Sequence, residues 1–308
     1  MRFTLRQLEI FVATAQLQTI SQAAYSLAMS QSAASSALGE LERQYNCQLF
    51  DRAGKRLILN KLGTQLLPQA IAVLEHASML DKELQGQTAL PDLSIGATMT
   101  IGNYLATLLI GEFIQQHTSC KINLHVQNSE QIEHLVAQYQ LDLALIERLS
   151  TNPNIETLPW ISDELVVFCA PEHPLAQQKK ADLNELLEHT WILREKGSGT
   201  RQTFDHAIRH LHKPLHISME LEHTEAIKRA VESGLAISCI SRLALRDAFR
   251  RGSLVPIETP DLDLKRQFFF IWAKNKYQFS SMRTFINYCL ARTKHISASQ
   301  DFPLPNIA

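Results

Sequence analysis

The stretch of residues 21–42 constrains the fold most, because it contains two short helical patterns with almost no chain between them. In the first pattern, Ala24 and Leu27 follow Ser21, which we expect to be the N-cap since its side chain can accept a backbone N–H of the first turn. Ser30 is expected to cap the second helix, in which apolar residues recur every three to four positions. This spacing predicts a helix-turn-helix, whose second helix presents its first polar residues to a DNA major groove.

The polar residues of the second helix favour DNA binding over a plain solvated surface. They are short or bidentate hydrogen-bonding side chains suited to base edges and phosphates, namely Gln31, Ser32, Ser35 and Ser36. A solvated helix face would more often carry Glu and Lys. Two amphipathic helices of an ordinary all-α core are the alternative interpretation.

A basic turn follows these helices. Residues 51–56 predict a tight turn between Phe50 and an apolar strand at 57–59, which is the pattern of a wing. The cations of this turn, Arg52, Lys55 and Arg56, are candidates for phosphate contacts. Together with Ser21, Ser30 and the four polar residues of the second helix, they complete the predicted DNA-binding set. The whole chain has a net charge of −1, whereas residues 1–61 have a balance of +3. DNA affinity would therefore depend on a few placed cations.

A long helix is predicted next, with Asn60 as its N-cap. Its apolar residues keep a 3.5-residue repeat over about three heptads, which is typical of a coiled-coil seam: Leu66, Ala70, Val73, Ala77, Leu80 and Leu84. A long helix between two domains needs a partner, so we predict homodimerisation through this seam, within a homodimer or a homotetramer. Packing inside its own chain is the alternative, and residues 85–91 are expected to be a hinge.

From residue 92 onward, strands and helices alternate. The βαβαβ order of residues 93–146 predicts a mostly parallel sheet with right-handed crossovers. We expect the chain to cross into a second lobe near residue 161 and to return with the strand Gln267–Trp272, and we expect the last dozen residues to be a tail. The predicted domains are a DNA-binding domain at 1–60, a linker and dimerisation helix at 61–88, and a two-lobed α/β domain at 89–308. Lobe I would comprise about 92–160 and 267–308, and lobe II about 161–266.

Two predicted helix starts combine free backbone N–H groups with hydroxyls. One follows the first strand, at Thr98 and Thr100, and the other lies in the turn 194–201. Such starts suit anions, and open α/β sheets bind ligands at the carboxyl ends of their strands. Glu147 would oppose an anion there unless Arg148 or Arg194 offset its charge. The predicted effector-binding set is Thr98, Thr100, Ile101, Glu147, Arg194, Ser198, Gly199 and Thr200.

The first 85 residues resemble, nearly position by position, the N-terminal domain of LysR-type transcriptional regulators. The matching residues are Leu5, Leu8, Phe11, Ser21, Ala23, Ala24, Leu27, Ser30, Gln31, Ser32, Ala33, Ser35, Leu41, Glu42, Leu49, Phe50, Arg52, Leu59 and Gly63. The rest resembles, more diffusely, the two-lobed effector domain of the same regulators, a fold akin to periplasmic binding proteins. The resemblance implies an N-terminal all-α winged helix-turn-helix, a long linker helix and a C-terminal α/β two-lobed domain.

The resemblance also implies a function. The chain would be a sequence-specific DNA-binding transcriptional regulator, dimeric or tetrameric, in which a small effector bound between the lobes reorients the DNA-binding domains. In the family the turn after the first strand lines the inducer cleft, which carries over to Thr98 and Thr100. The Gly197–Arg201 pattern resembles members that regulate sulfur assimilation or carbon fixation and sense small anions.

Other function classes are disfavoured. Ser198 lies in GSGT and not in a G-x-S-x-G elbow, and neither paired carboxylates nor a metal-ligand cluster appears in the sequence, so we expect no enzyme, metal or cofactor beyond a small anionic effector. No apolar run approaches the ~20 residues of a membrane span, and the N-terminus is a poor signal peptide, so a cytoplasmic location without a membrane partner is expected. These features also disfavour a transport-type binding protein. A ligand-independent architectural regulator, in which the C-terminal domain serves only oligomerisation, stays open.

Overall fold

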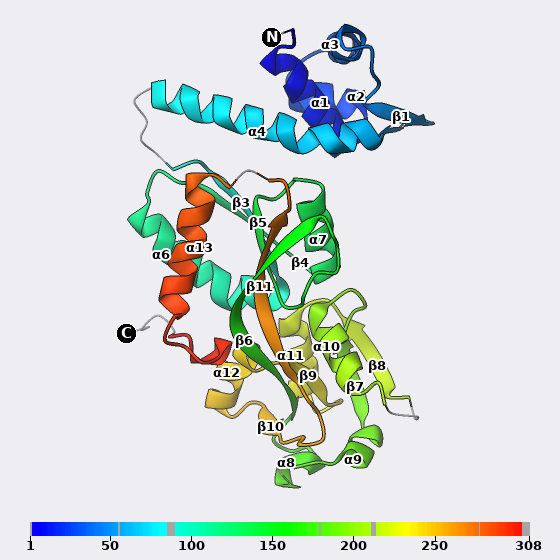
Figure 1. Cartoon of the computed structure of the whole chain (residues 1–308). Helices are drawn as coiled ribbons and strands as arrows, with labels where there is room; N and C mark the ends of the chain where they lie inside the picture. The colour runs from blue at the N-terminus through cyan, green and yellow to red at the C-terminus, as the bar shows by residue number, and fades with distance from the viewer. Residues whose placement is uncertain are drawn as a thin grey trace.

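The computed structural model describes residues 2–54, 56–84, 90–178, 180–210, 214–276 and 278–303. Most of the predicted hinge, residues 85–89, and the predicted phosphate contact Lys55 lie outside these ranges. The N-terminal elements are α1 (Leu5–Leu17), α2 (Ile20–Ser26), α3 (Gln31–Gln44), β1 (Phe50–Ala53) and β2 (Arg56–Leu59). We call this unit the head. The order of its elements confirms the predicted winged helix-turn-helix (Figure 1).

The two helix starts of the head differ in how well the sequence predicted them. Ser30 caps α3 as predicted, since its side chain accepts from the backbone nitrogen of Ala33. The prediction that Ser21 caps α2 is wrong, because Thr19 takes that place and accepts from the backbone nitrogen of Gln22. The earlier start brings Ile20 into the helix, where it packs against the core of the head.

Small buried residues allow the helices of the head to pack closely. Ala23 and Ala34 are 0% exposed, and α2 and α3 close over Ile10 and Phe11 of α1. The wing strands pair antiparallel, with Phe50 opposite Leu59. Burial of one face of each helix leaves their polar faces outside, as an amphipathic pattern requires.

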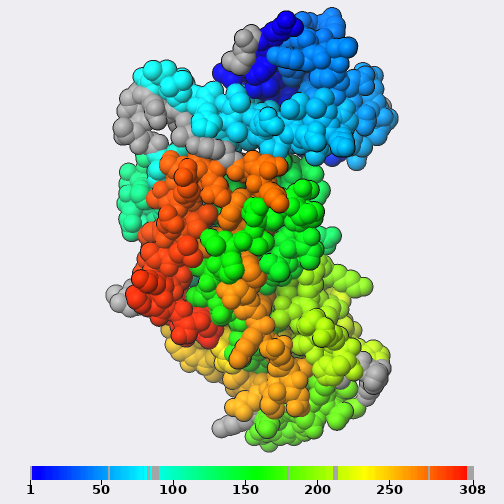
Figure 2. Space-filling view, in the orientation of Figure 1, coloured from blue at the N-terminus to red at the C-terminus, as the bar shows by residue number. Residues whose placement is uncertain are grey.

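The linker helix α4 runs from Lys61 to Leu84, and its start is capped by Asn60, which accepts from the backbone nitrogen of Gly63 over 2.9 Å. Its first half belongs to the core of the head through Leu67 and Ile71. In Figures 1 and 2, α4 lies across the end of the C-terminal part, with the remainder of the head on its far side.

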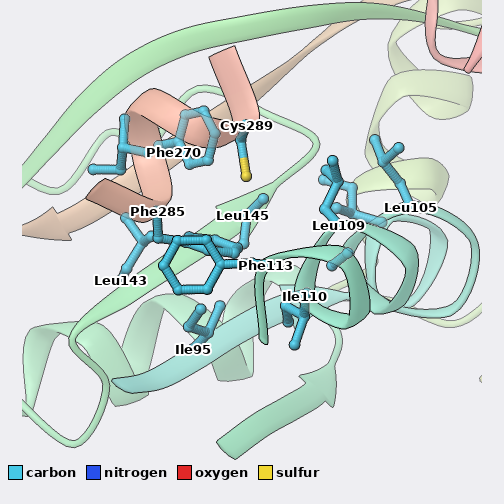
Figure 3. Close-up of a cluster of buried hydrophobic side chains, with 14 of the residues drawn as sticks. Ile95, Leu105, Leu109, Ile110, Phe113, Leu143, Leu145, Phe270, Phe285 and Cys289 are labelled. Carbon is cyan, nitrogen blue, oxygen red and sulfur yellow. The ribbon is translucent and has the colours of Figure 1, made fainter. Parts of the chain in front are cut away.

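Lobe I is built on a parallel βαβαβ unit, as predicted. Strand β3 (Leu93–Thr98) pairs in parallel with both β4 (Ile122–Gln127) and β5 (Leu143–Ile146). The connecting helices are α5 (Met99–Ile101), the π-helix η1 (Gly102–Ala106), α6 (Thr107–Gln116) and α7 (Ser129–Ala137). The apolar core between sheet and helices gathers around Phe113, which meets Phe285 of α13 (Ser280–Thr293) edge to face (Figure 3).

Two long strands join lobe I to lobe II. They are β6 (Ile155–Cys169) and β11 (Lys265–Ala273), which pair antiparallel along their length. In lobe II, β9 (Ser238–Ser241) and β10 (Val255–Ile257) pair with β6, and β7 (Thr190–Arg194) pairs in parallel with β8 (His216–Leu221). The helices of lobe II are α8 (Pro174–Gln178), α9 (Leu183–Leu187), α10 (Gly199–Ala207), α11 (Thr224–Glu232) and α12 (Arg242–Arg251). Because both lobes share β6 and β11, bending of these strands changes the angle between the lobes.

The prediction of a C-terminal tail is wrong for residues up to 302. A short 3-10 helix, η2 (Ser299–Asp301), follows α13, and Phe302 is 1% exposed in the core of lobe I. Arg246 of α12 donates to the carbonyl oxygens of Gln300 and Phe302. Phe302 and Arg246 therefore hold this segment against the protein. Within the described residues, no helix combines the length and apolarity that a membrane crossing requires.

Candidate functional site

The predicted base-reading residues lie on the exposed face of α3. Gln31, Ser32, Ser35 and Ser36 are all exposed, and the hydroxyls of Ser30 and Ser32 lie 3.1 Å apart. Ser21, although not a cap, is exposed on α2. The surface therefore presents short polar side chains over the first turns of the second helix of the motif.

The wing brings cations next to α3. Arg52 on β1 and Arg56 on β2 are exposed, and Arg52 lines a hollow of about 410 Å³ together with Ser35 of α3. The sequence-predicted base contact and phosphate contact thus adjoin one groove of the head. This arrangement suits a duplex whose base edges face α3 and whose backbone faces the wing.

The apolar repeat of α4 divides between two environments. Ala70 is buried and Leu66 half-buried against the core of the head, whereas Val73, Leu80 and Leu84 are 40%, 57% and 78% exposed. Ala77 is half-buried. An apolar hollow of about 450 Å³ beside the stripe is lined by residues of the head and of α4, among them Phe3, Leu41, Tyr45, Leu62 and Gln69. Large exposed apolar side chains beside such a hollow are typical of a surface that another chain covers.

Between the lobes, threonines from opposite sides converge on one carboxylate. Thr98, at the end of β3, donates from Oγ1 to Oε2 of Glu147 over 2.8 Å. Thr200, in the first turn of α10, donates to Oε1 of Glu147 from both its backbone nitrogen and its hydroxyl, each over 3.0 Å. Glu147 is 2% exposed. The sequence predicted that these threonines would bind an external anion. In the structure they donate instead to Glu147, a carboxylate of the chain itself.

The sequence left open whether Arg148 or Arg194 would offset the charge of Glu147. Arg148 does not, because it binds Glu133 over 2.6 Å. Arg194 forms its ion pair with Glu195 over 2.8 Å. The principal partner is Arg266 at the start of β11, whose guanidinium lies 3.4 Å from Glu147.

Arg266 joins Glu147 to a second buried carboxylate. It donates from Nε to Asp163 over 2.6 Å and from Nη1 to the hydroxyl of Thr200 over 3.0 Å. Among the described residues its Nη2 is buried without a hydrogen-bond partner. Arg266 was not among the residues predicted from the sequence, although a basic residue directly before the apolar strand Gln267–Trp272 could have marked it.

These contacts determine the charge of Glu147. Burial by itself raises the pKa of a carboxyl, but Arg266 and Arg194, with hydrogen bonds from Thr98 and Thr200, outweigh it and hold the pKa of Glu147 below its usual 4.5. At neutral pH the cleft therefore contains a buried, ionised carboxylate.

The glycine-rich turn supports this arrangement. Ser198 is fully buried and caps α10 by accepting from the backbone nitrogen of Arg201, so its hydroxyl serves the helix start. Gly199 donates to Ser129 over 3.2 Å, and a Cβ on Gly199 would lie 2.6 Å from Cγ of Glu147. Only a glycine allows this approach. Thr100 is buried in the first turn of α5, and Ile101 packs in the core of lobe I.

In the part of the chain that the structure describes, no group of three or more His, Cys, Asp or Glu side chains is arranged to hold a metal ion. No disulfide links the five cysteines, all of which lie in the described residues, and Cys120, Cys169, Cys239 and Cys289 are buried. Burial raises the pKa of Cys169 to about 11, which makes its thiolate rare at neutral pH.

The features of the head and of the cleft together define a DNA-binding regulator with a ligand-binding fold. The family described as bacterial regulatory helix-turn-helix protein, lysR family, matches residues 5–64, and the family described as LysR substrate binding domain matches residues 87–294. The chain belongs to the LysR family of transcriptional regulators.

Relatives of known sequence cover nearly the whole chain. It is 40% identical over 290 residues to the uncharacterized HTH-type transcriptional regulator YeiE of Escherichia coli (strain K12), covering 94% of this chain and 98% of that protein. It is 29% identical over 278 residues to the RuBisCO operon transcriptional regulator of Allochromatium vinosum, covering 90% of this chain and 92% of that protein. The predicted likeness to regulators of carbon fixation is thereby confirmed.

Among solved structures, the regulatory domain of Synechocystis PCC6803 CcmR in complex with 2-PG superposes with a TM-score of 0.63 and 29% identity. The match covers 67% of this chain and 99% of that domain. The fold of the effector domain is therefore shared with a regulator whose structure contains a small ligand.

Proposed function

We propose that this LysR-type regulator responds to a small anion that takes the place of the Glu147 carboxylate between the lobes. The observation that carries the proposal is the set of donors on Glu147, which comes from both lobes: Thr98 from lobe I and the start of α10 from lobe II. An oxyanion of similar size could accept the same hydrogen bonds, aided by Arg266 and Arg194. The complex of CcmR with 2-PG supports a small ligand in such a domain.

The assembly belongs to the same proposal. We infer a homodimer through the exposed part of the α4 seam, or a tetramer built from such dimers, because Val73, Leu80 and Leu84 leave a large apolar stripe uncovered. The working division is a DNA-binding domain at 1–60, a linker and dimerisation helix at 61–88, and an effector domain at 89–308. In this division the exposed residues of α3 and the wing bind double-stranded DNA, and the protein acts in the cytoplasm without catalysis.

A second candidate follows from the same carboxylate. Because Glu147 already satisfies the donors of both lobes, the C-terminal domain could hold its shape without any ligand. The chain would then be a constitutive DNA-binding regulator whose C-terminal domain serves oligomerisation.

One experiment separates the two candidates. Calorimetry of the full chain with sulfate, phosphate and 2-PG tests for anion binding, in the wild type and in Glu147→Gln. Because the anion and Glu147 would use the same donors, loss of the competing negative charge should strengthen binding of such an anion by about 1.4 kcal/mol or more, about tenfold. Glu112→Gln is the matched control, because it removes an exposed carboxylate that pairs with Arg292 in lobe I.

The outcomes are distinct. An anion that binds the wild type and Glu112→Gln equally, but Glu147→Gln at least tenfold more tightly, supports the anion-responsive function. Equal binding to all three proteins would place the anion outside the cleft. If none of the anions gives a heat of binding, and DNA binding is unchanged in their presence, the result favours the ligand-independent regulator.

A further inference from the structure

Two ion pairs close the opposite ends of one pair of strands. Strands β5 and β11 pair antiparallel, and at the cleft end Arg266 lies 3.4 Å from Glu147. At the other end Asp142 directly precedes β5, Lys276 follows β11, and their charged atoms lie 2.9 Å apart. We call this pair of strands with its two ion pairs the ladder.

Lys276 also reaches the linker helix. Its Nζ lies 2.9 Å from Oε1 of Glu75 on α4. The side chain of Lys276 is 2% exposed, and those of Glu75 and Asp142 are 22% and 17% exposed. A pair so shielded from water is little screened by salt. We call these three residues the latch.

A second contact lies beside the latch. Gln16 of α1 donates to the carbonyl oxygen of Tyr139 over 3.4 Å, and Gln140 donates to the carbonyl oxygen of Gln16 over 3.5 Å. Tyr139 also packs against the core of the head. The turn that leads into β5 therefore touches both α1 and, through Lys276, α4.

We propose that the ladder is the connection by which the cleft controls the placement of the DNA-binding head, with Glu75 as the residue that couples α4 to it. All four residues of β5 are buried, so a one-residue slip would turn core side chains to the wrong face. The two strands therefore move as one body. A displacement of Glu147 and Arg266 at one end shifts Asp142 and Lys276 at the other, and the latch passes the shift to α4.

Hydrogen–deuterium exchange on the full chain, without any anion, tests the ladder independently of the proposed effector. Glu147→Gln perturbs the cleft end, and Glu75→Gln removes the charge of α4 from the latch while Asp142 still pairs with Lys276. Exchange is followed in residues 71–84 of α4 and in α10. Thr98→Val provides a milder cleft variant that removes one hydrogen bond.

We expect Glu147→Gln to raise exchange in α4 several-fold in the wild-type background and to add nothing there in the Glu75→Gln background. The control background is Glu112→Gln, which removes an exposed carboxylate of α6 that pairs with Arg292 of α13 and not with the latch. In it the effect of Glu147→Gln on α4 should remain intact. Unchanged exchange in α4 for both cleft variants overturns the proposal whatever happens in α10, and so does an equal increase in the presence and absence of Glu75.

Discussion

The backbone nitrogen and the hydroxyl of Thr200, in lobe II, both donate to one carboxylate oxygen of Glu147, in lobe I, each over 3.0 Å. One side chain of the protein thus ties the start of α10 to the opposite lobe. A ligand can change the angle between the lobes only through its differential affinity for the two arrangements. Any anion in this cleft must therefore compete with Glu147.

Removal of the charge of Glu147 should change the acid stability of the protein. Because its pKa is depressed in the folded state, ionised Glu147 stabilises the fold above the usual pKa of 4.5, and this contribution is lost as the pH falls through its lowered pKa. We expect Glu147→Gln to be less stable at pH 7 by about 1–3 kcal/mol and to lose less stability on acidification below pH 4.5. Urea unfolding between pH 3 and 7 measures both effects.

The control for this prediction is Glu112→Gln. The pKa of Glu112 is also lowered, through its hydrogen bond with Arg292, but the pair is solvent-exposed and should contribute little. Parallel stability curves of Glu147→Gln and wild type below pH 4.5 would contradict the role assigned to the ionised carboxylate.

Gly199→Ala should destabilise the effector domain. The new Cβ would lie 2.6 Å from Cγ of Glu147 and 2.7 Å from Oγ of Ser129, so the carboxylate must move, at a cost of about 1–3 kcal/mol. Gly111→Ala, in the interior of α6 with no atom within 4 Å of the added Cβ, should instead stabilise by about 0.5–1 kcal/mol. Thermal unfolding of both variants tests the opposite signs, and a shift of the same sign in both would refute the close approach.

Substitution of Ser32 and substitution of Arg52 should weaken DNA binding in different ways. With an operator selected by the protein from random duplexes, Ser32→Ala should weaken specific binding by about 1–3 kcal/mol and leave nonspecific binding unchanged. Arg52→Ala should weaken both kinds of binding and reduce the slope of affinity against salt by about 1. Fluorescence anisotropy at a series of salt concentrations, on specific and unrelated duplexes, measures both the affinity and its dependence on salt. If the two variants behaved alike, the proposed division between base contact and phosphate contact would be wrong.

Charges in the exposed stripe of α4 should break the dimer. The double variant Val73→Glu and Leu80→Glu places unpaired carboxylates where an apolar partner surface is expected. Sedimentation should show loss of one oligomeric interface, and operator affinity should fall because two half-sites need two linked heads. Ser78→Glu adds a charge at an exposed place off the stripe and should leave the mass unchanged. A double variant with wild-type mass would mean that the stripe is not an interface between copies.

Local spacing predicted the elements of the chain well, because the information for a helix or strand lies within a few residues. The caps Ser30 and Asn60, the βαβαβ order of lobe I and the wing were all predictable in this way. Ser21 was the exception, since Thr19 lies two residues earlier and caps the helix instead, which brings Ile20 into α2, where it packs against the core of the head.

The amino-acid sequence by itself determined the family, the order of the elements and the two threonine-bearing helix starts that face each other between the lobes. Only the tertiary structure decided what those ends hold. Glu147 meets Thr98 across 49 residues of chain and Thr200 across 53, and its counter-charge comes from Arg266 on a strand that returns from lobe II. No periodicity encodes such contacts, because they depend on which strands pair and in which register. The latch was equally unpredictable, because its charges lie far apart in sequence and meet only when β5 pairs with β11 and α4 packs on lobe I.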